Sequence, residues 1–276
     1  MIQKDIHWLS KDSINLFAHT WSPDSNSKAV IVLIHGFGEH CLRYTPYINF
    51  FINENISVLG FDLQGHGQTK GNRGVIKSYN SVLDDIDMAL SKAEELFPKI
   101  PKILYGHSMG GNLVSNYLIR RKPKLAGAII TSPWLKLSNE PNFILKALVS
   151  ILSKITPNIT TDSKLDTKYI STVEDEVLKY KTDPLNHSRI SFLLFNEIKN
   201  RGVFAIKNSS QINIPVLVMH GTDDNITSPT ASQQMYINNK RLLEYKTWKN
   251  CYHELHNELI REELAKYVID WINKKL

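Results

Sequence analysis

The sequence predicts an α/β fold in which helices cover both faces of a mostly parallel sheet. Short apolar runs, typical of strands buried on both faces, alternate with longer stretches of helical periodicity. Such alternation favours parallel strands joined by crossover helices. It stops at Trp134 and resumes near Ile214. We therefore expect one α/β core, residues 1–133 and 213–276, interrupted by a helical insertion over 134–212.

The expected elements follow from their local patterns in chain order. Residues 14–21 alternate between apolar and polar side chains, which is typical of the edge strand of a hairpin. The continuous apolar run at 29–36 predicts a buried strand, and Pro98 ends the helical period that begins at residue 80. Further strands are expected at 56–62, 102–106, 125–133, 214–221 and 242–247. Helices are expected at 44–54, 80–97, directly after Ser108, 230–239 and 254–274. The insertion has helical patterns at 142–155, 173–180 and 190–200 and no convincing strand.

Composition places the chain among ordinary globular proteins. Its 276 residues are 42% hydrophobic and 22% charged, with a formal net charge of +6. We find neither the roughly 18–20 apolar residues of a membrane span nor a secretory signal. Cys41 and Cys251 are too few for a disulfide framework, so a reducing cytoplasm is expected. The basic cluster at 120–124 is interpreted as cations at a helix C-terminus, with weak attraction to anionic lipid as the alternative. No sequence motif indicates nucleic-acid binding.

Ser108 lies in a tight turn between a predicted strand and a predicted helix. It is the centre of a Gly-x-Ser-x-Gly pattern formed with Gly106 and Gly110. In such a turn the strained backbone projects the hydroxyl from the carboxyl edge of the sheet, and side chains at the flanking glycines would collide with neighbouring elements. The pattern alone is moderately specific, because a plain strand-to-helix turn can carry an incidental serine. A serine nucleophile also needs a base and a carboxylate.

Candidates for both partners follow later in the chain, each after a predicted strand. Asp223 and Asp224 follow the strand at 214–221, and His253 and His256 precede the last helix. The carboxyl ends of parallel strands meet at one sheet edge, and the order serine, acid, histidine is the one that this type of fold requires. Serine catalysis is therefore expected, with two acids and two histidines competing for the roles.

Six motifs along the chain are informative together: HGFGEHCLRY (35–44), DLQGHGQTKGNRG (62–74), GHSMGG (106–111), YKTDPL (180–185), HGTDDN (220–225) and YHELHNE (252–258). By these motifs the chain resembles the monoacylglycerol lipase and lysophospholipase branch of the α/β-hydrolase superfamily nearly end to end. This resemblance implies the α/β-hydrolase fold with an inserted helical cap, and it implies Asp224 as the acid and His253 as the base. The oxyanion hole is expected from the N–H of Met109, the residue after the nucleophile, and the resemblance puts the second donor at Phe37.

The insertion is expected to roof Ser108 as a cap. Its segment NFILKALVSIL has an apolar band too wide for a solvated helix, so the band either packs the cap onto the core or lines an acyl tunnel and contacts lipid. We expect a cytoplasmic serine hydrolase, peripheral to membranes, that cleaves esters of single-chain lipids, first of all monoacylglycerol. Lysophospholipase or short-chain carboxylesterase is the alternative, and a non-catalytic ligand-binding protein is the remote one. No cofactor is expected, and no metal, because no histidine pair has zinc-site spacing.

The two cysteines fall beside the oxyanion loop and the expected catalytic histidine. Cys41 and Cys251 are interpreted as small buried residues. The alternative is that alkylation of these thiols inhibits the enzyme by crowding its site.

Overall fold

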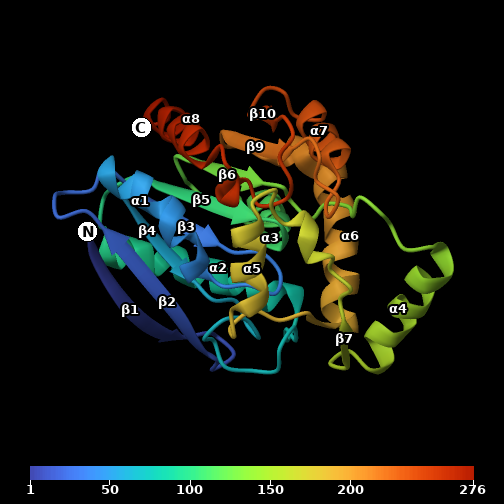
Figure 1. Ribbon diagram of the computed structural model, residues 1–276. Coiled ribbons are helices and arrows are strands. Elements are labelled where there is room, and N and C mark those ends of the chain that lie inside the picture. The colour runs from blue at the N-terminus through green and yellow to red at the C-terminus, as the bar shows by residue number, and fades with distance from the viewer.

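The computed structural model describes residues 1–276 and contains one large twisted sheet (Figure 1). Neighbouring strands pair in parallel except at one side, where β2 pairs antiparallel with both β1 and β4. The predicted α/β class with a mostly parallel sheet is therefore confirmed. The strand order is β1 (Ile2–Leu9), β2 (Asn15–Ser22), β4 (Ile56–Phe61), β3 (Ala29–Ile34), β5 (Lys102–His107), β6 (Gly127–Thr131), β9 (Val216–Gly221) and β10 (Leu243–Trp248).

The sheet separates two apolar cores. Side chains of α1 (Thr45–Asn53) and α8 (Arg261–Asn273) fill one, and the two helices contact each other. The other face is covered by α2 (Tyr79–Leu96), α3 (Met109–Arg121), α6 (Phe192–Asn208) and α7 (Pro229–Ile237). Every residue of β3, β4 and β9 is buried, as expected for strands covered on both faces.

Two predicted details of the secondary structure are wrong. The edge strand is β1, which was not predicted, and the strand expected there at 14–21 is the second strand, β2. Most of β1 is exposed, so it has little of the apolar pattern that reveals a strand. The last helix begins at Arg261 rather than 254, because a separate 3₁₀ turn, η4 (Leu255–Asn257), precedes it.

The segment between β6 and β9 contains helices and a small second sheet. Its elements are α4 (Phe143–Ile155), β7 (Thr160–Asp162), η2 (Thr167–Tyr169), α5 (Glu174–Thr182), β8 (Arg189–Ser191) and α6. The antiparallel pair β7–β8 was not predicted, since three-residue strands are too short to show a period.

Helix α4 stands out from the body of the molecule, with α6 as its neighbouring helix (Figure 1). Only Val149 and Ser153 of this helix are buried. The hypothesis that its apolar band packs the cap onto the core is therefore wrong for most of the band. The exposed apolar side chains of α4 are Phe143, Ile144, Leu145, Leu148, Ile151 and Ile155.

No helix of the structure combines the length and the apolar character needed to cross a bilayer.

Candidate active site

Ser108 lies at the sharp turn between β5 and α3. Its backbone has φ 53° and ψ −114°, a strained conformation for a residue with a side chain. A Cβ atom on Gly106 would lie 2.5 Å from the carbonyl oxygen of Gly110, and one on Gly110 would lie 2.1 Å from the carbonyl oxygen of Ile34. The predicted reason for both glycines is therefore confirmed, because backbone atoms occupy the space that a side chain would need.

A continuous chain of hydrogen bonds joins the serine, one histidine and one acid. The Oγ of Ser108 lies 2.9 Å from Nε2 of His253, and Nδ1 of that ring lies 2.7 Å from Oδ2 of Asp224. The three side chains follow β5, β10 and β9, and all three residues are buried. Three loops far apart in the sequence thus meet at the carboxyl edge of the sheet.

Asp224 and His253 stabilise each other's charged form. Burial would raise the pKa of Asp224, but His253 and His220 outweigh it and hold the pKa of the carboxyl group well below its usual range. Burial would lower the pKa of His253, but the Asp224 carboxylate raises it above the usual value. The acid therefore stays ionised and stabilises a proton on the imidazole.

The two competing candidates lie elsewhere. Asp223 is exposed, and its carboxylate accepts a hydrogen bond from the neighbouring Thr222 hydroxyl. His256 lies in η4 rather than in the first turn of the last helix, and its ring stacks on Tyr44 with centroids 4.3 Å apart. Neither side chain is hydrogen-bonded to Ser108, whose Oγ has His253 as its partner.

Two polar side chains around Asp224 were missed by the sequence analysis. Nε2 of His220 lies 2.9 Å from Oδ2 of Asp224, and the Thr227 hydroxyl lies 2.9 Å from the same oxygen. The backbone N–H groups of Ile226 and Thr227 donate to Oδ1 at 2.8 and 3.0 Å. The available signal was a histidine at the end of a buried strand, four residues before the acid.

The predicted oxyanion donors lie on two segments, the turn that carries Ser108 and the loop after β3. Met109 is the first residue of α3, so its N–H is one of the donors at a helix start that have no partner within the helix. Phe37 follows β3 and lines the same cavity as Ser108. Gly38 has φ 73°, a left-handed conformation that glycine adopts without strain, and this bends the loop back after Phe37.

A cavity of about 670 Å³ opens in front of Ser108. Phe37, His107, His253 and Trp134 line it near the serine. The segment 134–212 contributes a mostly polar stretch at 161–166 and an apolar wall, which includes Leu137, Leu145, Val149, Ile190, Phe192 and Phe195. Cys41 and Cys251 are both buried and free, and neither lines this cavity.

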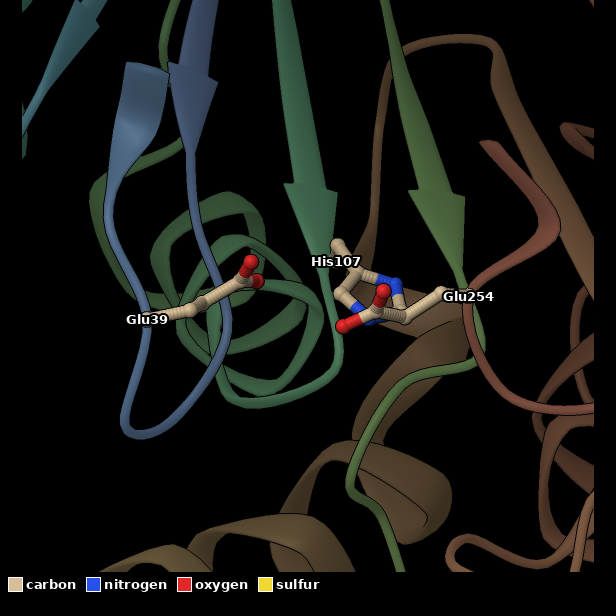
Figure 2. A group of neighbouring side chains, drawn as sticks. All are labelled: Glu39, His107 and Glu254. Atoms are coloured by element: carbon tan, nitrogen blue, oxygen red, sulfur yellow. The ribbon is translucent and has the colours of Figure 1, made fainter. Parts of the chain in front are cut away.

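Glu39, His107 and Glu254 are neighbours in space (Figure 2), and all three line the cavity. One ligand atom from each lies within 4.8 Å of the others, a spacing that a metal ion could bridge. However, the Arg43 guanidinium donates to both carboxylates, with two bonds of 2.8 Å to Glu254. Because Arg43 already supplies the positive charge, we interpret the group as a buried ion-pair network rather than a metal site.

The segment 134–212 is hydrogen-bonded to two of the site loops. The N–H of Glu254, beside the histidine, donates to the carbonyl of Ile170 at 2.7 Å. The N–H of His187 donates to the carbonyl of Gly38 at 2.9 Å, next to Phe37. This segment therefore supports the loops on which the predicted base and oxyanion donor lie.

The site has a serine on a strained strand-to-helix turn, a histidine hydrogen-bonded to it, and an acid hydrogen-bonded to that histidine, in the chain order serine, acid, histidine. This combination is typical of the serine hydrolases of the α/β-hydrolase superfamily. A family model described as serine aminopeptidase, S33, matches residues 25–260. The chain belongs to this family, within its monoacylglycerol lipase branch, and it is a serine ester hydrolase.

Three similar proteins illustrate the range of the family. The crystal structure of a monoacylglycerol lipase from Paleococcus ferrophilus superposes with a TM-score of 0.87 at 32% identity, covering 95% of this chain and 99% of that one. A phospholipase of Bacillus subtilis is 31% identical over 90% of this chain and 95% of its own length. An abhydrolase domain-containing protein of Dictyostelium discoideum is 35% identical over 97% of this chain, but the chain spans only 29% of that protein.

Proposed function

We propose that this enzyme hydrolyses esters of single-chain lipids, with monoacylglycerol as the main substrate, through an acyl-enzyme on Ser108. The observation that carries the proposal is the hydrogen-bonded series Ser108–His253–Asp224, whose serine and histidine line a cavity with an apolar wall. An acyl chain suits that wall, and the similarity to a monoacylglycerol lipase of known structure supports the same substrate class.

In the first half-reaction His253 takes the proton of the Ser108 hydroxyl through Nε2 while Oγ attacks the ester carbonyl carbon. The Phe37 and Met109 N–H groups stabilise the oxyanion, and one such donor is worth roughly 3 kcal/mol in the transition state. When the tetrahedral intermediate collapses, the C–O bond to the alcohol breaks and His253 gives its proton to the leaving alkoxide.

In the second half-reaction His253 removes a proton from water, which attacks the acyl-enzyme carbonyl. When the second tetrahedral intermediate collapses, the bond between the acyl carbon and Ser108 Oγ breaks, the fatty acid leaves, and His253 returns the proton to Oγ. Asp224 stays ionised in both halves, holds the ring with its proton on Nδ1 and stabilises the imidazolium.

We propose that residues 134–212 form a cap on a core made of 1–133 and 213–276, and that α4 contacts the lipid surface. Phe143 and Ile155 of this helix are 80% and 71% exposed, which is costly in water for side chains of this size. Leu145 and Val149 of the same helix line the cavity. A helix that reaches both the lipid surface and the cavity offers a path for a single-chain substrate.

Lysophospholipid is the second candidate substrate, because one relative is a phospholipase. A panel of monoacylglycerol, lysophosphatidylcholine and nitrophenyl esters of rising chain length separates the candidates. We expect the highest kcat/KM on monoacylglycerol and a rise with acyl length. An optimum at two to four carbons would contradict the proposed acyl path. Ser108→Ala is the matched control, and its rate on every ester should fall on the order of a million-fold.

A further inference from the structure

Asp224 shares one carboxylate oxygen between two imidazole rings. Oδ2 lies 2.7 Å from Nδ1 of His253 and 2.9 Å from Nε2 of His220, whereas Oδ1 accepts two backbone N–H groups. The same Oδ2 also lies 2.9 Å from the Thr227 hydroxyl. Both oxygens of the carboxylate thus accept hydrogen bonds, and His253 is only one of several donors.

The hydrogen bonds of His220 indicate that its Nε2 carries a proton. Asp224 is ionised and can only accept, so Nε2 of His220 must donate. The other nitrogen, Nδ1, lies 2.8 Å from the Ser232 hydroxyl of α7. In a neutral ring Nδ1 accepts, so Ser232 is the donor there. Since the His220 side chain is fully buried, both bonds form away from water.

His220 does not line the cavity, so it acts through Asp224 and not on the substrate. From this arrangement, and resting on the proposed triad, we infer that His220 is a positioning residue that orients Asp224 and limits how strongly this carboxylate attracts the proton of His253. A donor that shares Oδ2 withdraws negative charge from the bond to His253. Without it, the carboxylate would be less well held and more basic toward the imidazolium.

The test compares two substitutions of equal burial but different hydrogen bonding. The His220→Gln variant keeps an N–H donor near the position of Nε2, whereas His220→Phe fills the space without a donor. We expect kcat/KM of His220→Phe to fall about 10- to 100-fold, the usual cost of a lost hydrogen bond to a charged group. The acid limb of its pH profile should move to higher pH, and His220→Gln should stay near wild type in both respects.

A readout independent of turnover distinguishes a change in the Asp224–His253 hydrogen bond from misfolding and from failure of the proposed function. The NMR resonance of the proton between His253 and Asp224 should shift in His220→Phe and stay in place in His220→Gln. Ser232→Ala, which removes the donor to Nδ1, should move both readouts in the same direction by a smaller amount.

Two results would overturn the inference. The first is a wild-type rate and pH profile in His220→Phe. The second is an equal loss in the phenylalanine and glutamine variants with no shift of the acid limb, which would mean that His220 only fills space. If Ser108→Ala kept its activity, the proposed triad would fail instead, and the NMR comparison would still show whether His220 controls the Asp224–His253 bond.

Discussion

Asp224 and His253 shift each other's proton affinity because they are buried together, 2.7 Å apart. The base must be neutral before it can take the proton of Ser108. Since Asp224 raises the pKa of His253 above its ordinary value of 6.5, activity should be low at pH 6 and rise as the pH passes through this raised value.

The measurement is kcat/KM on a short nitrophenyl ester between pH 5 and 9, with the stability of the protein checked across the range. We expect a single acid limb with a midpoint above about 6.5. A midpoint well below that value would mean that the carboxylate does not stabilise the imidazolium.

Sequence patterns predicted the residues of the hydrogen-bonded chain but not their surroundings. The turn at Ser108 and the loops with Asp224 and His253 have strong local signals, because the flanking glycines and the chain order restrict which residue types can occupy these positions. His220 has no such signal, since one histidine at the end of a buried strand is compatible with many structural roles. Its contact with Asp224 depends on how the loop after β9 folds back, which a local pattern does not show.

At the scale of elements, α4 has one side that lines the cavity and another side that is exposed. Leu145 and Val149 face the cavity, whereas Phe143 and Ile151 are 80% and 55% exposed. Its apolar band was visible in the sequence. Whether that band faced the core or solvent depends on the packing of α4 against α6, which the pattern did not reveal. The short strands β7 and β8 were missed because their pairing is long-range.

Replacing Phe143 and Ile151 with serine should weaken lipid binding without altering the chemistry. Burying a side chain of this size in an apolar phase is worth about 1.5–3 kcal/mol, so the double variant should bind phosphatidylcholine vesicles at least about tenfold more weakly. Its kcat/KM on a monomeric short ester should not change. Vesicle co-sedimentation and an ester assay provide the two measurements.

Leu259→Ser is a suitable control for this experiment. Leu259 is 87% exposed, but it lies in the loop before α8 and outside the segment 134–212. Equal loss of vesicle binding in this variant and in the α4 variant would contradict a specific role for α4.

At the scale of the whole molecule, the sheet brings three distant loops to one edge and buries several titratable groups behind them. This architecture was predictable, because buried apolar runs alternating with helices leave few other folds. The loop between β10 and α8 was not, since residues 255–257 form a 3₁₀ turn where the helical pattern had been extended. His256 consequently lies in the interior, stacked on Tyr44, with neither ring nitrogen hydrogen-bonded.

Protonation of His256 should destabilise the fold at acidic pH. Burial lowers its pKa to about 4, although Glu254 and Glu39 oppose the shift. An unfolded histidine has a pKa of about 6.5, so the unfolded state binds the proton first as the pH falls. The stability that depends on the neutral ring is complete above about pH 6.5, and about 2 kcal/mol of it should be lost by pH 5.

Urea unfolding at pH 7.5 and pH 5 measures this effect when wild type is compared with His256→Phe, which keeps an aromatic ring on Tyr44. The wild type should lose more unfolding free energy between the two pH values than the variant. Identical losses in both proteins would show that His256 is not the responsible group.

The most direct test of the central claim is covalent labelling by a long-chain fluorophosphonate, followed by peptide mass mapping. We predict one adduct per chain, located on Ser108, with labelling strongly slowed in a His253→Ala variant that remains folded. An adduct on a different residue, or unchanged labelling without His253, would contradict the account of Ser108 as a nucleophile activated by His253.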